Sequence, residues 1–390
     1  MKRYYLLFAL LFRAKFFWKK PKQCDFVIYD RLSLVFLKYD FDISKFFILD
    51  TRKESFNIPI LLKTIIIYNF NWSPEKYYNW VIKVVNPKII ITLIDNDIKF
   101  WNIKKNFKNL TTISIQNGRR SNFIDIYSKL DDTKLNKFFI DYMFVQNESI
   151  GKKVSSYIKG KVIPIGSVYN NRIPIESEKV NNNILFISEW VSTGNKKIFT
   201  DEYRYPEKII IPFLYKFAKS NGLKLSILGR PYRNSPNIKK QKLEYQFYYN
   251  IIKSKDWDHI FPNSETGQSY KLIDQSKIIV GITSTLIYES IARGKPTAVF
   301  SSRGQKLNGN TGFKFGWPSD LPDNGPFWTN LNDVNEFTRI LNYLKNIDSK
   351  EWNEVSRPYL SYCMKYDKYN LSFLNQKMDL KTYMWLRLLI

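Results

Sequence analysis

The stretch IIVGITSTLIYESIARGKPTAVF, residues 278 to 300, decides the expected fold, because it reads as strand, turn, helix and second strand. The β-branched run at 278–280 is typical of a strand buried on both faces of a parallel sheet. Gly281 lets the backbone turn close to a ligand. Gly294 ends the predicted helix before Pro296 opens the next strand. The stretch therefore predicts a β-α-β unit of the kind found in nucleotide-handling α/β domains.

Three hydroxyl side chains stand at the start of this predicted helix: Thr283, Ser284 and Thr285. They can cap free helix amides, or they can bind an anion together with those amides and the positive helix end. Capping needs only one hydroxyl, so the surplus favours a phosphate site over an ordinary capped unit. Glu289, one turn beyond Thr285, would contact a ribose or orient a hydroxyl, although a Glu early in a helix is also favourable electrostatically.

Beyond Pro21, short apolar runs alternate with helical stretches, which indicates parallel sheets. The first series of expected strands covers residues 25–29, 46–49, 64–68, 88–93, 112–116 and 142–146, with a helix near 74–85. The second covers residues 184–188, 224–228, 278–281 and 298–301, with helices near 206–220 and 269–275. We expect an α/β fold with two Rossmann-like parallel-sheet domains facing a cleft, over 23–172 and 184–345, joined by a linker at 173–183.

The charge of the chain is strongly positive, with 61 Lys and Arg against 35 Asp and Glu and a formal net charge of +26. Such a field attracts polyanions. No zinc-finger spacing, basic heptad region or aromatic RNA-binding signature occurs, so we expect no specific nucleic acid as partner, but an anionic membrane surface and a phosphorylated substrate. The two cysteines, Cys24 and Cys363, form no metal or redox motif, and a single histidine excludes a histidine-rich metal site.

The first residues, 1–22, form a basic amphipathic segment whose apolar run is interrupted by Arg13 and Lys15 and is too short to span a bilayer. No small-residue cleavage site follows. Aromatic and leucine residues mixed with lysines fit a helix lying in the membrane interface, and the alternative is a first helix packed on the protein itself. We expect a cytoplasmic protein, peripheral on the inner face of the cytoplasmic membrane.

Polar residues follow the strands of the first series, where ligands of open parallel sheets bind. Asp95 follows the strand that ends at Ile94, and Asn117 and Arg119 follow the next strand. A carboxylate beside an amide and an arginine could place a general base near an anion-binding group. The alternatives are a helix cap for Asp95 and a tight turn at Asn117.

The second series delivers a comparable set. Glu189 follows one strand, and Arg230 follows another, placed to meet a phosphate by forked hydrogen bonds or to lie on the surface. His259 and Phe261 belong to a segment that could hold a nucleobase, unless His259 is a satisfied loop histidine. The aromatics of residues 315–330 could form a platform for a sugar ring, or belong to a packed loop.

Six blocks carry a resemblance to a known family: Ile94-Asp95-Asn96, Ile115-Gln116-Asn117-Gly118-Arg119, Pro164-Ile165-Gly166-Ser167, Ile187-Ser188-Glu189-Trp190, residues 283–294 and residues 324–329. In this order they resemble bacterial O-antigen and surface-polysaccharide biosynthesis transferases, which are related in architecture to GT-B glycosyltransferases. The resemblance implies a C-terminal domain that binds a nucleotide-sugar, an N-terminal domain that presents the acceptor, and C-terminal helices, within 346–390, that cross back to the N-terminal domain.

Carried onto this sequence, the resemblance assigns donor phosphate to Thr283, Ser284 and Thr285 and a donor contact to Glu289. The full expected donor set is Gly281, Thr283, Ser284, Thr285, Glu289, Arg230, Glu189, His259 and Phe261, and the catalytic candidates facing the acceptor are Asp95, Asn117 and Arg119. No cofactor is expected beyond a CMP-, UDP- or GDP-linked sugar as substrate. The acidic run at 95–97 lies in the wrong domain for a donor metal, so transfer without metal is expected.

The leading hypothesis is a glycosyltransferase that moves a sugar from a nucleotide-sugar to a lipid-linked glycan in O-antigen or capsule-type polysaccharide biosynthesis. Two alternatives stay open. One is a CDP-activated polyol-phosphate transferase, since the hydroxyl turn also resembles that of CDP-glycerol polymer transferases. The other is a non-enzymatic, membrane-associated scaffold of polysaccharide assembly.

Overall fold

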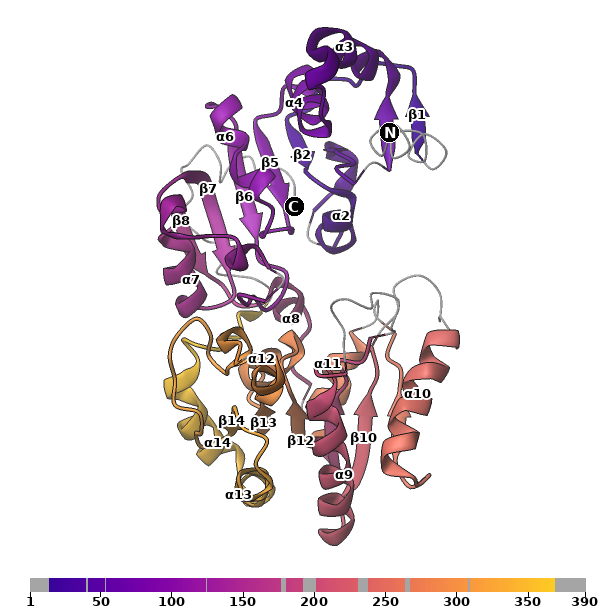
Figure 1. Ribbon diagram of the computed structural model, residues 1–390, viewed down its shortest axis with the longest axis vertical. Helices are drawn as coiled ribbons and strands as arrows, with labels where there is room; N and C mark the ends of the chain where they lie inside the picture. Colours follow the sequence, from indigo (N-terminus) through magenta and orange to yellow (C-terminus); the bar gives the residue numbers. More distant parts are fainter. Residues whose placement is uncertain are drawn as a thin grey trace.

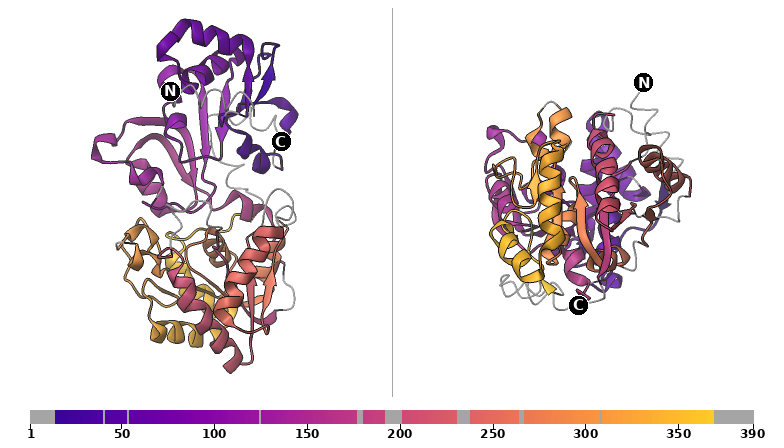
Figure 2. Two further views of the ribbon diagram at one scale, coloured as in Figure 1. Left: turned by 45° about the vertical axis from the view of Figure 1, so that its right-hand side comes forward. Right: turned by 90° about the horizontal axis from the view of Figure 1, so that it is seen from below.

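A computed structural model describes residues 14–39, 41–52, 54–123, 125–176, 180–191, 201–230, 238–263, 267–307 and 309–368. These residues form two six-stranded parallel sheets, one in each half of the chain, and a separate two-stranded pair. The two halves are stacked along the long axis of the molecule (Figure 1), and each carries helices on both sides of its sheet (Figure 2). The predicted α/β fold with two Rossmann-like parallel-sheet domains is confirmed.

The N-terminal sheet has the strand order β3-β2-β5-β6-β7-β8. Its strands are β2 (Phe26–Ile28), β3 (Phe46–Ile48), β5 (Ile89–Thr92), β6 (Thr111–Ile115), β7 (Phe138–Val145) and β8 (Ile158–Pro164). The helices of this half are α2 (Arg31–Leu37), α3 (Ile58–Tyr68), α4 (Pro74–Val85), α5 (Ile98–Trp101), α6 (Ile103–Asn106), α7 (Glu148–Ser155) and α8 (Val168–Arg172). Ile90 packs in the apolar core on one face of the sheet, and Ile89 and Ile91 pack in the core on the other. Burial of both faces explains why these strands read as continuous apolar runs.

The strand expected over residues 64–68 is wrong, because these residues end helix α3. Asn57 caps this helix through its side chain, which accepts a hydrogen bond from the amide of Ile60, and Pro59 lies in the first turn. Both are helix-start signals. Ile60 and Thr64, four residues apart, supply the buried side. A β-branched run alone does not separate strand from helix, and here the cap outweighs strand propensity.

The helix expected within residues 1–22 is also wrong where the structure describes that segment. Lys15–Phe17 forms strand β1, which pairs in parallel with β4 (Ser55–Asn57). Its exposure alternates along the chain, as it does in a strand with one covered side. Residues 1–13 lie outside the described part of the chain. None of the described helices is both long and apolar enough to cross a bilayer.

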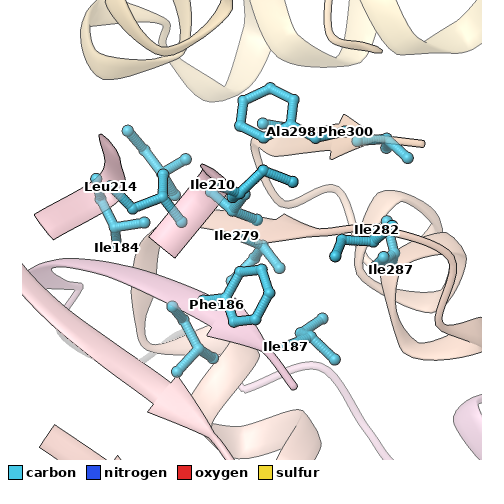
Figure 3. Packing of buried hydrophobic residues seen from close by; sticks show 14 of the residues in the cluster. Ile184, Phe186, Ile187, Ile210, Leu214, Ile279, Ile282, Ile287, Ala298 and Phe300 are labelled. Atoms are coloured by element: carbon cyan, nitrogen blue, oxygen red, sulfur yellow. The ribbon is translucent and has the colours of Figure 1, made fainter. Parts of the chain in front are cut away.

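The C-terminal sheet has the order β11-β10-β9-β12-β13-β14. Its strands are β9 (Asn181–Ile187), β10 (Lys224–Leu228), β11 (Asp258–Ile260), β12 (Ser276–Gly281), β13 (Thr297–Phe300) and β14 (Trp328–Thr329). The helices are α9 (Tyr205–Ser220), α10 (Ile238–Ile252), α11 (Gln268–Asp274), α12 (Thr285–Ala292), α13 (Val334–Asn346) and α14 (Ser349–Ser356). Figure 3 shows side chains such as Phe186, Ile279 and Phe300 interdigitating in the core of this domain.

The strand order of the C-terminal sheet indicates where a ligand is expected to bind. Counted along the chain, the order is 3-2-1-4-5-6, the doubly wound order of dinucleotide-binding domains. Its direction of winding reverses between β9 and β12, and ligands of such sheets bind in the crevice beyond the carboxyl ends of the strands at this point. The residues that follow β9 and β12 are therefore those to examine.

The segment of residues 315–330 is packed, and the hypothesis of an aromatic platform is wrong for its three largest buried rings. Phe315, Phe327 and Trp328 are each no more than 1% exposed. The ring centroids of Phe315 and Trp328 lie 4.6 Å apart. These rings belong to the core of the C-terminal domain, because the loop turns them inward beneath α14.

After α14 the chain returns to the N-terminal domain. The backbone amide of Ser149 donates to the carbonyl of Ser361 at 3.2 Å, and the side-chain amide of Asn147 donates to the carbonyl of Cys363 at 2.7 Å. The Tyr366 hydroxyl donates to the carbonyl of Ile173 at 2.9 Å. The contacts described are made by residues 361–367, which follow the helices, and residues 369–390 lie outside the described part.

Candidate functional site

At the point where the winding of the C-terminal sheet reverses, the residues after strands β9 and β12 are hydrogen-bonded to each other. Glu189 follows β9 and Thr283 follows β12. The amide of Thr283 donates to Glu189 Oε1 at 2.6 Å, and its hydroxyl donates to Oε2 at 2.7 Å. Both predicted donor-site residues thus lie at the expected edge, where they bind each other.

A buried arginine completes this cluster. Arg303, just beyond β13, is fully buried and donates to Glu189 and Thr283 on one side and to Glu207 on the other, at 2.7 Å. Burial by itself would raise the pKa of Glu189, but the Arg303 guanidinium and the hydrogen bonds from Thr283 and Arg303 outweigh it and hold that pKa below its ordinary value. Glu189 is therefore an anion at neutral pH, and it fixes the turn after β12.

Arg303 and Glu207 are absent from the sequence prediction. Arg303 could have been found, because it follows a predicted strand at 298–301 and the residues after each strand were the ones expected to matter. Glu207 lies in the first turn of α9 and is 1% exposed. Nothing in its local sequence separates it from a solvated glutamate.

The hydroxyls at the start of α12 have separate partners. Ser284 is the N-cap of α12 and accepts a hydrogen bond from the amide of Leu286 at 3.3 Å. Thr285 Oγ1 accepts a hydrogen bond from the backbone amide of Arg119, in the other domain, at 2.8 Å. Of the three hydroxyl groups predicted to bind phosphate, Thr283 thus serves the cluster around Glu189 and Thr285 joins the domains. Ser284 is left at the helix end.

Gly281 is required by packing of its own unit. A Cβ atom at this position would lie 2.4 Å from Cδ1 of Ile287 on α12. Such an approach leaves no room for a side chain, because α12 folds back tightly over the end of β12. The lack of a side chain at Gly281 therefore makes room for Ile287.

Arg119 binds the C-terminal domain through its side chain as well. It donates to the hydroxyl of Tyr288 at 3.3 Å, to the carbonyl of Gly312 at 2.9 Å and to the carbonyl of Lys314 at 3.1 Å. These acceptors belong to the protein itself. In this arrangement the side chain predicted to meet the acceptor joins the two domains beside the start of α12.

Asp95 is paired with an arginine from the neighbouring strand end. Arg120 donates through Nε at 2.8 Å and through a second nitrogen to the two oxygens of Asp95, which is 1% exposed. Arg120 also donates to Asn117 Oδ1 at 2.8 Å. Burial would lower the pKa of Arg120, but Asp95 outweighs it and raises that pKa, so Arg120 is a cation. Burial also raises the pKa of Asp95 above its ordinary value, although Arg120 opposes this shift. The geometry makes Asp95 and Asn117 supports of Arg120 and its turn.

The helix cap considered for Asp95 belongs instead to a nearby residue. Asp97 is the N-cap of α5, and its side chain accepts a hydrogen bond from the amide of Lys99. Asp95 uses its side chain on Arg120, as described above.

Glu289 faces the domain junction. Its Oε1 accepts a hydrogen bond from the hydroxyl of Ser167, the N-cap of α8, at 2.5 Å. Tyr270 supplies a second hydrogen bond, and burial raises the pKa of Glu289 above its ordinary value. One turn farther along the chain, Arg293 is paired with Asp274 and donates to the carbonyl of Pro174 at 2.9 Å. This side of α12 is bound to the segment that links the domains.

The remaining predicted donor residues lie around β10 and β11. Arg230 is exposed and makes no hydrogen bond or ion pair with the residues that the structure describes. The rings of His259 and Phe261 are 4.2 Å apart, and the His259 side chain is 3% exposed. His259 packs inside an aromatic cluster with Trp257 and Tyr245. Among the residues that the structure describes, Arg230 therefore has no bonded partner, unlike Glu189 and Thr283 of the predicted donor set.

No group of three His, Cys, Asp or Glu residues that could hold a metal ion occurs in the described ranges.

Comparison with known proteins places the chain in a family. Residues 113–380 match the model of a family described as "putative O-antigen biosynthesis protein". The chain belongs to this O-antigen biosynthesis family. The match covers the last three strands of the N-terminal sheet and the whole C-terminal sheet, and the predicted resemblance to surface-polysaccharide biosynthesis proteins is confirmed. A search of curated proteins found no match.

Solved structures show distant similarity to this O-antigen family member. The wall teichoic acid polymerase TagF is 13% identical, with 94% of this chain and 88% of that chain covered and a TM-score of 0.47. UDP-GlcNAc 2-epimerase from Neisseria meningitidis is 12% identical, with 93% and 98% covered and a TM-score of 0.46. A mutant of S. aureus TarM, solved with UDP, is 14% identical with a TM-score of 0.42; 81% of this chain is covered, but it spans only 58% of TarM.

Proposed function

We propose that this O-antigen family member is a glycosyltransferase that moves a sugar from a nucleotide-sugar to a lipid-linked glycan, at the inner face of the cytoplasmic membrane. The single observation that carries the proposal is the placement of two groups at the carboxyl edge of a doubly wound sheet: an arginine with no partner among the described residues, and a helix start. Arg230 follows β10 and Ser284 begins α12, on either side of the β9 end. Membership of the O-antigen biosynthesis family supports a role of this site in the synthesis of a surface polysaccharide.

In the proposed site the donor diphosphate meets Arg230 and the start of α12. The guanidinium can bind two phosphate oxygens through forked hydrogen bonds. Ser284 and the positive end of helix α12 would bind the same phosphate. Both groups would stabilise the phosphate that leaves as the sugar is transferred, without a metal ion.

Three residues, Glu189, Thr283 and Arg303, would position the donor indirectly, because they hold the turn between β12 and α12. Glu189 accepts two hydrogen bonds from Thr283 at 2.6 and 2.7 Å, and Arg303 holds Glu189 from behind. Because this cluster is buried, the turn before α12 is held rigidly and its amides keep one orientation. The three residues are thus proposed as positioning residues.

The acceptor is proposed to lie against the N-terminal domain near the turn at 117–120. Asp95 is doubly hydrogen-bonded by Arg120, so it holds this turn and leaves proton abstraction to another group. An acceptor that carries a pyrophosphate lipid would suit the positive charge of the chain.

Nucleotide binding tests the site directly. A thermal-shift screen with CMP, CDP, UDP and GDP identifies the nucleotide, and calorimetry then compares the wild type with Arg230→Ala. We expect the variant to raise Kd about tenfold to 100-fold, the loss of a charged hydrogen bond worth about 1.5–3 kcal/mol. Arg357→Ala, an exposed arginine beyond α14, is the matched control and should leave Kd unchanged.

Equal Kd values for Arg230→Ala and the wild type would refute the phosphate site. Release of CMP from CDP-glycerol, in place of nucleotide release from UDP-, GDP- or CMP-sugars, would show polyol-phosphate transfer instead. Absence of binding to all four nucleotides would leave the scaffold hypothesis.

A further inference from the structure

Helix α3 exposes an apolar side to solvent. Leu62 is 54% exposed, Ile65 40%, Ile66 79% and Ile67 49%. Leu62, Ile65 and Ile66 share one side of the helix, and Ile60 and Thr64 on the other side pack against the domain. Ile67 is exposed near the C-terminal end of the helix. Single exposed apolar residues are normal, but a contiguous group on one helix marks an interaction site.

The last residue of strand β1 and the residue after it add two aromatic rings beside the start of this helix. Phe17 is 52% exposed and Trp18 is 74% exposed. Phe17 pairs with Asn57, the residue that caps α3, and the Asn57 side-chain amide donates to the carbonyl of Lys19 at 2.7 Å. Figure 1 shows α3 and β1 together at the end of the N-terminal domain that lies farthest from the C-terminal domain. We call these six residues the α3 surface: Phe17, Trp18, Leu62, Ile65, Ile66 and Ile67.

The segments that carry the α3 surface are almost wholly positive, and Glu54, whose carbonyl accepts a hydrogen bond from the amide of Lys15, adds an acidic residue beside strand β1. Residues 15–22 and 58–83, which carry the surface and the adjoining helix α4, contain seven lysines and a single acidic residue, Glu75. The lysines are Lys15, Lys19, Lys20, Lys22, Lys63, Lys76 and Lys83. Several lie over aromatic rings at the edge of the surface: Lys63 Nζ is 4.6 Å from the ring centroid of Trp80, and Lys76 Nζ is 4.6 Å from that of Tyr68.

We infer that the α3 surface docks this protein on an anionic lipid bilayer, with the isoleucines and Trp18 in the interface and the lysines against the headgroups. Exposed aliphatic and Trp side chains with a basic rim are the composition of segments that lie in a membrane surface. Lysine stems can extend along the apolar patch while their ammonium groups reach lipid phosphates. Charge complementarity therefore selects an anionic bilayer over a neutral or basic partner.

This assignment differs from the sequence expectation of a membrane helix within residues 1–22. The described part of that segment contains strand β1 and no helix. The larger exposed apolar face belongs to α3, whose isoleucines were predicted to form a buried strand. The inference bears on the lipid-linked acceptor of the proposed function, but it concerns another surface of the molecule and needs no nucleotide.

Vesicle co-sedimentation of the full chain tests the inference. The wild type is expected to bind vesicles of equimolar phosphatidylglycerol and phosphatidylcholine, and to bind pure phosphatidylcholine more weakly. Ile66→Glu should lower the partition coefficient about tenfold or more, since it puts a charge at the centre of the apolar contact. Leu243→Glu, which makes a comparable change at a 47% exposed leucine on α10, is the matched control and should bind as the wild type does.

A second variant separates charge from apolar contact: Lys20→Gln combined with Lys63→Gln should weaken binding to the anionic vesicles and leave binding to phosphatidylcholine unchanged. Thermal melting reports whether each variant is folded. Unchanged vesicle binding of Ile66→Glu would overturn the inference. If the wild type is a dimer and Ile66→Glu is a monomer that still binds vesicles, the surface would instead be a contact between copies of the chain. Loss of nucleotide affinity in Arg230→Ala with normal vesicle binding would concern the donor site alone.

Discussion

The chain contains the tripeptide Ile-Ile-Ile twice in its N-terminal domain, and the two copies have opposite fates. Residues 89–91 form most of strand β5, where Ile89, Ile90 and Ile91 are no more than 2% exposed. Residues 65–67 lie in helix α3, where the exposure of each isoleucine is 40% or more. The same three side chains thus stabilise a core at one position and face solvent at the other.

The difference arises from neighbouring residues. Strand β5 is bordered by β2 and β6, so both of its edges are paired. Its two faces pack in the apolar cores on either side of the sheet. Helix α3 begins at a capping Asn57 with Pro59 in its first turn, and it lies outside the sheet. The apolar side chains set how much free energy burial can contribute. The helix cap at Asn57 and the neighbouring strands of β5 decide whether the isoleucines are buried.

The largest effect is expected from truncating one isoleucine of each copy. Ile90→Ala should reduce the free energy of unfolding by about 2–5 kcal/mol, because it removes buried methyl groups and leaves a cavity. Ile66→Ala, at a 79% exposed position, should change it by less than about 0.5 kcal/mol. Urea unfolding followed by circular dichroism measures both. Equal losses would show that α3 is covered in solution.

A smaller effect is expected from removing the cap that makes α3 a helix. Asn57→Ala should cost about 0.5–2 kcal/mol, since the amide of Ile60 loses its side-chain acceptor. Asn57→Ser keeps an acceptor oxygen at the cap and should cost less, although it loses the bond to Lys19. Thermal melting compares the two, and an Asn57→Ala protein as stable as the wild type would contradict the role given to the cap.

The smallest effect is expected from a buried charged residue, Glu289, and it concerns the pH dependence of stability. Burial raises the pKa of Glu289 in the folded protein, so the folded state binds this proton more tightly than the unfolded state does. Its contribution to stability is present below the unfolded pKa and is lost as pH rises through the folded pKa. The stability of Glu289→Gln relative to wild type should therefore increase as pH rises above the ordinary glutamate value of 4.5.

Chemical unfolding at a series of pH values measures this difference. A flat difference between Glu289→Gln and wild type would mean that Glu289 is solvated in the folded protein.

Predictions made from the sequence succeeded where local signals agreed with the tertiary environment. Helix α4 runs from Pro74 to Val85 and strand β10 from Lys224 to Leu228, the ranges that were predicted. Ser73 and Pro74 begin that helix, and Leu225 and Ile227 are buried as a strand of a doubly covered sheet requires. Residues 64–68 failed because β-branched propensity and helix-start signals conflicted.

The candidate site was predicted in position but not in detail. Glu189 and Thr283 were named because each follows a strand, and the parallel sheet brings these two strand ends together. Their mutual hydrogen bonds, and the burial of Arg303 between Glu189 and Glu207, depend on side chains distant in sequence. The same is true of Arg119, whose partners at Tyr288 and Gly312 belong to the other domain.

From the sequence alone came the two α/β halves, the turn at 281–285 and the excess of positive charge, because these follow from composition and from spacing along the chain. The tertiary structure decided which hydroxyl remains at the start of α12, whether Arg230 has a partner among the described residues, and which isoleucines face solvent. The physical reason is that burial and pairing depend on distances between residues far apart in sequence. Local propensity contains no information about those distances.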